Sequence, residues 1–385
     1  MKKVIWRPKA VSRPALGLIA LLSAVGMLMV EQFRVDRQQA YHQEKIEAAQ
    51  MAERAFKVVY DARMGIEEIV PEFDPLETGL IGVVRSSITS VHGVLPSKQT
   101  SVNPNFAAVM VDMLKRAGVK EGDKVGVGLS GSFPALNICT LVAIESLGAE
   151  PIPISSGAAS QWGANLPKLM WVDMEKLLYE QGILEHRSIA ASIGGEEDRG
   201  ENLSPEGRIE VQNGLVRCGF DPLPSETFKQ AVDLRMKLMR DAAGPQGLKC
   251  YVNVGGGAVS AGTSVGKKMF DEGLNMRPPL RMPPELDGVM PRLSRQGIPV
   301  INIINIVDLA ERFGLPVAPM ADQRELVEVG QGAVFEAIDY NKPLAFGVLV
   351  VIVASLFGFI RSDIGFRLLQ GGHSRKQAGH PEPMV

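Results

Sequence analysis

Apolar residues fall into two long uncharged runs near the ends of the chain, with shorter apolar runs between them. The long runs cover residues 15–30 and 343–360, and neither contains Asp, Glu, Lys or Arg. With adjoining residues, each reaches roughly the 20 residues that a helix needs to cross a bilayer. We therefore predict transmembrane helices over residues 14–32 and 343–360. The alternative is two buried core helices of a soluble protein.

Between these spans, short extended runs alternate with helical patterns. Residues 125–129 are mainly apolar and end in small residues, a helical pattern starts at Pro134, and a second extended run begins at Pro151. Strands joined this closely through a helix pair in parallel by a right-handed crossover. We predict an α/β fold, with a mostly parallel sheet and flanking helices, held between an N-terminal and a C-terminal transmembrane helix.

The segment that follows the first span favours a helix. Residues 31–68 lack proline, have Gly65 as their only glycine, and are rich in Ala, Gln, Glu, Lys and Arg. We predict a helical stalk over residues 33–70 that extends the membrane helix outward. Its apolar stripe packs either on the domain's own core or on a partner subunit. Proline residues at 71–75 end this helix, which places the α/β domain at residues 71–340.

Basic residues flank both spans on their terminal sides, and cytoplasmic segments of membrane proteins carry an excess of Lys and Arg. We therefore predict a cytoplasmic basic segment at 1–13, a cytoplasmic tail at 361–385 and an extracytoplasmic main domain. No small-residue cleavage pattern follows residue 30, so the first span is predicted to be a retained anchor rather than a signal peptide. The flanking residues are Lys2, Lys3, Arg7, Lys9 and Arg13 before the first span, and Arg361, Arg367, Arg375 and Lys376 after the second.

Composition narrows the partners of the domain. The formal net charge of −2 over 385 residues gives no electrostatic reason to bind nucleic acid, and none is expected. Cys139, Cys218 and Cys250 lie far apart and form no metal-binding spacing, so neither a metal nor a cofactor is predicted. We interpret these cysteines as small buried apolar residues, with a single disulfide bridge as the alternative.

A glycine- and serine-containing turn at residues 128–134 separates the first predicted strand from its helix. Glycine lets the backbone turn sharply, Pro134 suits the first helical position, and free amides at a helix start can hold an anion. The candidate catalytic residues are Ser130 and Ser132. Gly131 and Asn137 are candidate ligand-binding residues in the same segment.

A second turn repeats this pattern after another apolar extended run. It contains the triple glycine Gly255, Gly256 and Gly257, and it is interpreted either as a ligand-binding backbone or as a structural turn. Ligands of parallel sheets bind beyond the carboxyl ends of the strands, where the first turn is expected, and the sequence leaves open whether the two turns face one pocket. A resemblance to a P-loop is rejected because the glycine spacing differs and no hydroxyl residue follows the lysine. The remaining candidate ligand-binding residues are Ser260, Thr263 and Lys267.

An acidic loop at residues 194–200 places three adjacent acidic residues between glycines. Carboxylate oxygens in this density can bind a hard cation, but the alternating spacing of a calcium loop is absent. A solvated acidic loop is the interpretation we favour.

Several separated motifs together resemble the poly-gamma-glutamate system protein family. They are the Trp6-Arg7-Pro8 start, GLSGSFPALN at 128–137, SIGGEEDRG at 192–200 followed by LSPEGR, YVNVGGGAVSAG at 251–262, and INIVDLAERFGLP at 304–316. The resemblance implies a bacterial protein with a role in making, exporting or processing poly-γ-glutamate, whereas the two-pass placement in the inner membrane follows from the two spans and their basic flanks. It implies three kinds of partner: sibling membrane subunits, the anionic polymer and membrane lipid. It supplies no catalytic residue.

Two main classes of function follow. In the first, the protein is a membrane-anchored accessory component that binds polymer carboxylates or sibling subunits. In the second, it is a serine-dependent amide hydrolase or transferase that uses Ser130 or Ser132 as nucleophile, which requires a nearby base. His92 is the nearest histidine in sequence. A cytoplasmic nucleotide-binding domain is a third interpretation, and it requires the opposite membrane topology.

Overall fold

The computed structural model describes residues 13–224 and 226–361. The chain divides into two compact units, one formed by residues 1–37 with 337–385 and the other by residues 38–336. The predicted cytoplasmic segments at 1–13 and 361–385 lie outside the described residues, apart from Arg13 and Arg361. The domain unit therefore begins at residue 38, earlier than the residue 71 expected from the sequence.

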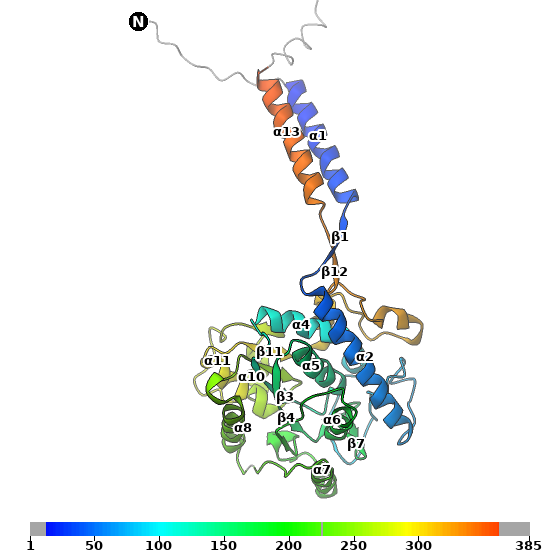
Figure 1. The fold of residues 1–385 in the computed structure, drawn as a ribbon, viewed down its shortest axis with the longest axis vertical. Coiled ribbons are helices and arrows are strands. Elements are labelled where there is room, and N and C mark those ends of the chain that lie inside the picture. The colour runs from blue at the N-terminus through cyan, green and yellow to red at the C-terminus, as the bar shows by residue number, and fades with distance from the viewer. Residues whose placement is uncertain (1–12, 225, 362–385) are drawn as a thin grey trace, which may run out of the picture. The chain divides into compact units, whose positions relative to one another are not determined.

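The first unit contains two long apolar helices, α1 (Arg13–Gln32) and α13 (Lys342–Arg361), which lie side by side (Figure 1). Both are long and apolar enough to cross a membrane. Their side chains are largely exposed, unlike those of a soluble protein's core helices. A methyl group at Gly26 would collide with Val348, so the helices approach closely at this glycine. Strands β1 (Val35–Gln38) and β12 (Glu336–Asp339) pair with each other.

The helix expected over residues 31–68 is interrupted. Helix α1 ends at Gln32, β1 follows, and α2 runs over His42–Met64. The prediction of a continuous stalk is wrong for residues 33–41, because helix propensity carries no information about the distant strand β12 that pairs with β1. Ala48, Ala52 and Val59 of α2 are fully buried in the domain core. Of the two packing partners considered, the domain's own core is the one observed.

A six-stranded sheet forms the centre of the domain, in the order β10-β11-β9-β3-β4-β8. All neighbouring pairs are parallel except β10 with β11, which confirms the predicted mostly parallel sheet. The sheet is doubly wound. Strands β4 and β8 extend it on one side of β3, and strands β9 and β11 extend it on the other side. The strands are β3 (Lys124–Leu129), β4 (Glu150–Ser156), β8 (Ala190–Ser192), β9 (Cys250–Val254), β10 (Gly273–Asn275) and β11 (Val300–Ile303).

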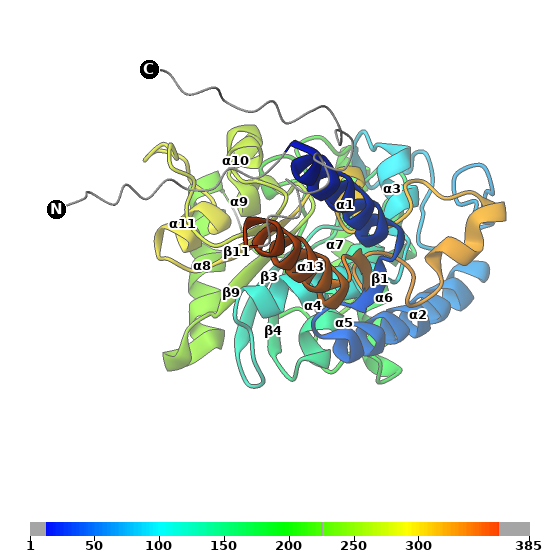
Figure 2. The ribbon, with the colours of Figure 1, turned by 90° about the horizontal axis from the view of Figure 1, so that it is seen from above.

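Helices cover both faces of this sheet. Val127, Val252 and Ile301 belong to the larger buried cluster, which includes α2, α4 (Phe106–Arg116), α5 (Pro134–Ser146) and α6 (Trp171–Glu180). Ile154 and Tyr251 belong to a second cluster with α8 (Phe228–Ala243) and α11 (Val289–Arg295). Figures 1 and 2 show α8 and α11 on one side of the strands and α2 and α5 on the other. Apolar residues on both strand faces are therefore buried.

Shorter elements complete the domain. Helix α6 starts at Trp171, directly after residues 165–170, which form the hairpin of β6 and β7. The other helices are α3 (Leu95–Ser101), α7 (Pro205–Arg217), α9 (Ala258–Ala261), α10 (Thr263–Met269) and α12 (Ile306–Arg312). The other strands are β2 (Thr89–Val91), β5 (Ala159–Ser160), β6 (Asn165–Leu166) and β7 (Leu169–Met170), and 3-10 turns lie at η1 (Glu196–Asp198), η2 (Gly244–Gln246) and η3 (Ala321–Val327).

A buried polar network joins α6 to strand β4. Trp171 Nε1 donates to Ser155 Oγ at 2.8 Å, and Ser155 Oγ lies 2.6 Å from Ser188 Oγ. Ser188 in turn donates through its hydroxyl to Glu175 Oε1 at 2.7 Å. Glu175 is fully buried, and desolvation raises the pKa of its carboxyl to about 7 despite the Ser188 hydrogen bonds and the nearby charge of Arg187.

This raised pKa predicts a loss of stability as pH rises. The folded state binds the Glu175 proton more tightly than the unfolded chain, so the stabilisation is complete below about pH 4.5 and is lost as the pH rises through about 7. The loss amounts to about 3 kcal/mol. We expect Glu175→Gln to gain stability relative to the wild type across this interval, measured by thermal unfolding of the detergent-solubilised full chain. Exposed Glu180→Gln on the same helix is the control, and parallel curves for wild type and Glu175→Gln would refute this assignment.

Candidate functional site

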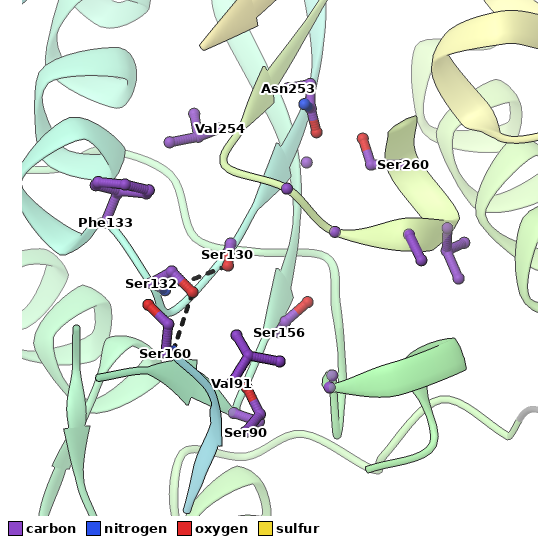
Figure 3. Close-up of a pocket in the computed structure, with 18 of the residues that line it drawn as sticks. Ser90, Val91, Ser130, Ser132, Phe133, Ser156, Ser160, Asn253, Val254 and Ser260 are labelled. Atoms are coloured by element: carbon purple, nitrogen blue, oxygen red, sulfur yellow. Dashed lines mark hydrogen bonds between the residues drawn. The ribbon is translucent and has the colours of Figure 1, made fainter. Parts of the chain in front are cut away.

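A cavity of about 830 Å³ lies at the carboxyl ends of β3, β4 and β9. It occupies the point where the chain order of the sheet changes direction, between β3 and β9, which is the usual ligand position in doubly wound sheets. Figure 3 shows Ser130 and Ser132 on one side of the strand ends and Ser260 on the other. The predicted candidates that line the cavity are Ser130, Ser132, Gly256, Gly257, Ser260, Thr263 and Lys267.

The two glycine-containing turns share this cavity. Leu129 of β3 is opposite Val254 of β9 in the parallel ladder, so the residues that follow both strands start side by side. A methyl group at Gly255 would lie 3.1 Å from Ser130 Cβ. The first turn therefore packs directly against the second, which settles a point that the sequence left open.

Within the first turn, backbone amides are bound by serine hydroxyls. The Ser132 amide donates to Ser130 Oγ at 3.2 Å, and the Ser160 amide donates to Ser132 Oγ at 3.1 Å (Figure 3). Each hydroxyl oxygen accepts here and keeps its own hydrogen to donate. This turn therefore offers two hydroxyl donors to an anion, and the Ser132 amide expected at the helix start is already used.

Two predicted ligand-binding residues are buried and hold the first turn in place without lining the cavity. Asn137 is fully buried and donates through Nδ2 to the Ser130 carbonyl at 2.9 Å, so it positions the turn and does not line the cavity. Gly131 is also buried, and a methyl group there would lie 2.9 Å from the Ala158 carbonyl oxygen. This close approach requires glycine, because an added Cβ would force the Ala158 backbone away.

Lys98, from the short helix α3, lines the cavity next to this turn. It is 3% exposed, and its Nζ donates to the Ser132 carbonyl and lies 2.8 Å from Ser160 Oγ. The ammonium group also lies 3.8 Å from the centre of the Phe133 ring. Burial lowers the pKa of Lys98 to about 7.

Helix α10, which follows the second turn, brings a second lysine, Lys267, to the cavity. A methyl group at Gly256 would lie 2.9 Å from Lys267 Nζ, so the amine rests against this glycine. Burial lowers the pKa of Lys267 as well. Ser260 Oγ lies 2.6 Å from the Tyr251 hydroxyl, whose pKa burial raises to about 12.

The acidic loop contributes a buried ion pair to the cavity wall. Asp198 and Arg235 are both buried and lie 2.6 Å apart, and Ser192 Oγ donates to Asp198 at 2.7 Å. Only Glu196 and Glu197 of this loop's acidic residues are exposed, so the solvated-loop interpretation is wrong for Asp198. Within residues 13–224 and 226–361, no group of three or more His, Cys, Asp or Glu residues is arranged to hold a metal ion.

His92 lines the cavity but contacts neither candidate nucleophile. Its Nδ1 lies 3.3 Å from Gln161 Oε1, and this amide is its hydrogen-bond partner among the described residues. The three cysteines are free and buried, in agreement with their interpretation as small core residues.

Sequence reasoning missed Lys98, Ser160 and Arg235. Lys98 precedes β3 by 26 residues in a segment with no strong pattern, and no local signal places it in the cavity. Ser160 follows the serine-containing end of β4 by four residues, and this proximity was the one available hint.

Comparisons with known proteins identify no relative. No family model matches the chain, and no curated protein or solved structure matches it either. The geometry of the cavity is therefore the main basis on which a function is proposed.

The contact between the turns predicts different tolerances at two neighbouring glycines. Gly255 has a φ of +84°, and a methyl group there would press on Ser130, whereas a methyl group at Gly257 would meet nothing within 4 Å. We expect Gly255→Ala to lower the free energy of unfolding by roughly 1–2 kcal/mol and Gly257→Ala to change it little. Thermal unfolding of both variants checks this, and equal melting temperatures would contradict the described contact.

Proposed function

We propose that this protein is a membrane-anchored accessory component of poly-γ-glutamate synthesis, export or assembly, whose cavity binds carboxylates of the polymer. The observation that carries the proposal is the presence of two partly or fully buried lysines, Lys98 and Lys267, in one cavity at the switch point of the sheet. The motif resemblance supplies the identity of the polymer.

The charges around the cavity favour an incoming anion. Among the described residues, neither Lys98 nor Lys267 has a carboxylate partner, and burial without a counter-charge lowers the pKa of both. A carboxylate bound beside Lys267 would supply that counter-charge and favour its protonated form. Asp198 does not compete for them, because Arg235 already pairs with it.

Hydroxyl groups add directional contacts to this charge. Ser130 Oγ and Ser132 Oγ accept amide hydrogens and retain their own hydrogens for a carboxylate oxygen. Exposed Glu196 and Glu197 lie among the lining residues, and Glu197 is paired with Arg199. These two carboxylates would repel a polyanion, so its tight contacts are assigned to the lysine and serine side.

The two apolar helices support a two-pass protein of the bacterial inner membrane. Basic residues beyond each helix favour cytoplasmic termini and an extracytoplasmic domain, where the polymer emerges. Sibling membrane subunits and lipid would contact the exposed apolar side chains of α1 and α13.

A serine-dependent amide hydrolase or transferase is the second candidate function. It is favoured by one observation, the 2.8 Å distance between Lys98 Nζ and Ser160 Oγ. Ser130 and Ser132, the nucleophiles considered from the sequence, have no such amine at their hydroxyls among the described contacts, and His92 contacts Gln161 instead.

Polymer binding should depend on Lys267 of helix α10. We expect Lys267→Met to weaken binding of a fluorescent poly-γ-glutamate oligomer by about 10-fold, because it removes a charge-assisted contact. Exposed Lys268→Met, one residue away and outside the cavity, is the matched control and should bind like the wild type. The measurement is fluorescence anisotropy on the full chain in nanodiscs. Equal affinities for all three proteins would contradict the proposed site.

The proposed topology has its own test. A fluorescent protein fused after Val385 should be fluorescent, and alkaline phosphatase fused at the same position should be inactive, because both reporters would lie in the cytoplasm. Alkaline phosphatase fused within an exposed loop of the domain, such as the one after Gly182, should be active. The reverse pattern would overturn the extracytoplasmic placement.

A further inference from the structure

The cavity holds a buried amine within hydrogen-bonding distance of a serine hydroxyl. Lys98 Nζ lies 2.8 Å from Ser160 Oγ, and both side chains line the cavity. A general base must lie roughly 2.6–3.2 Å from the oxygen whose proton it takes. Nζ donates to Ser160 Oγ here, and the Ser160 hydroxyl donates to the Gln161 carbonyl at 3.4 Å. The pair meets the distance requirement, and rotation of the hydroxyl hydrogen toward a neutral Nζ would give the direction that a base needs.

Burial of Lys98 favours the neutral amine that a base requires. Its side chain is 3% exposed and has no carboxylate partner among the described residues. Burial therefore lowers its pKa to about 7, so a substantial fraction of the amine has a free lone pair near neutral pH. Neutral lysine can then accept a proton from an adjacent hydroxyl.

Ser160 is held in place from two sides. It ends the short strand β5, where it is opposite Val91 of β2 in a parallel pair. Its amide donates to Ser132 Oγ at 3.1 Å, which fixes its backbone against the first turn. Ser130 and Ser132 belong to that turn and keep their own hydroxyl hydrogens. They could donate hydrogen bonds to the negative charge that develops on the carbonyl oxygen of a substrate.

We propose that Ser160 is the nucleophile and Lys98 the general base of an acyl-transfer site that cleaves amide bonds of an acidic chain. The substrate class, a γ-glutamyl amide, rests on the proposed function. This assignment moves the reactive hydroxyl from Ser130 and Ser132 to Ser160 and gives the first two the role of hydrogen-bond donors.

The chemistry proceeds in two balanced steps. Lys98 accepts the hydroxyl proton as Ser160 Oγ bonds to the carbonyl carbon. The C–N bond then breaks, and the lysine ammonium gives that proton to the departing nitrogen, which leaves an ester on Ser160 and a free amine. Water next attacks the ester and transfers one proton through Lys98 back to Ser160 Oγ. The product is a carboxylic acid, and an amine in place of water would give transfer.

The other titratable groups around the cavity make their own contacts, away from Lys98. Asp198 and Arg235 neutralise each other, and His92 contacts Gln161. Lys267 lies in helix α10 beside the second turn, and the Tyr251 hydroxyl contacts Ser260. Exposed Glu196 and Glu197 also line the cavity. The structure shows no ion pair between any of these groups and Lys98 within the described residues.

Labelling with a fluorophosphonate probe tests the pair directly. The full chain in nanodiscs is incubated with the probe, and the modified residue is mapped by peptide mass spectrometry. We expect the label on Ser160, with a rate that rises through an inflection near pH 7 as Lys98 loses its proton. Ser160→Ala should abolish labelling, and Lys98→Met should slow it by at least roughly 100-fold. Ser146→Ala, at the far end of α5, should label like the wild type.

Lys98→Arg keeps the positive charge but cannot supply a neutral base, so it should label as slowly as Lys98→Met. Melting temperatures identify any variant that has unfolded, and the pH profile of the wild type then decides. Labelling of Ser130 or Ser132, no labelling at pH 8, or a rate without an inflection near pH 7 would each overturn the assignment.

Polymer binding separates this inference from the proposed function. Ser160→Ala should still bind the fluorescent poly-γ-glutamate oligomer, while the wild type alone should shorten it, as read by mass spectrometry. Binding without labelling or shortening would overturn the acyl-transfer inference and leave the binding function standing. Labelling of Ser160 without oligomer binding would overturn the proposed polymer and leave the nucleophile–base pair standing.

Discussion

The parallel pairing of β3 with β9 is the constraint on which the site depends. The two strands lie far apart in the chain, yet their register places Leu129 opposite Val254, so the turns that follow must leave the sheet together. Gly255 is needed at this point because the backbone has a positive φ and lies against Ser130. A cavity then forms where the chain continues to opposite sides of the sheet.

Burial of two lysine side chains determines the chemistry of this cavity, because desolvation lowers the pKa of both amines. Two lysines lie in it without carboxylate partners among the described residues, whereas the buried Arg235 is fully paired with Asp198. An unpaired buried amine is costly, and functional sites are where proteins commonly tolerate such a cost. Binding of a carboxylate and proton transfer from a serine are two ways to use the same property, which is why both functions centre on this cavity.

Local sequence patterns predicted the strands and the helix that carry the glycine-containing turns of the site. The order of β3, α5 and β4 follows from apolar runs separated by glycine, serine and proline, and the same signal located β9. Long-range contacts were beyond such patterns. Lys98 reaches Ser160 through tertiary packing of α3, Asn137 faces inward because α5 is buried on all sides, and β1 interrupts a strongly helical composition because β12 pairs with it. In each case tertiary structure overrode or supplemented local preference.

The pairing of β1 with β12 has a consequence for the unfolded state. These strands bracket the domain, and they continue into two helices that contact each other. While these contacts persist, an unfolded domain is a closed loop rather than a free chain. Closing a loop of this length removes conformational entropy worth on the order of 5 kcal/mol in the chain-entropy treatment of cross-links. The helix pair would thus act on folding as a disulfide does, without a covalent bond.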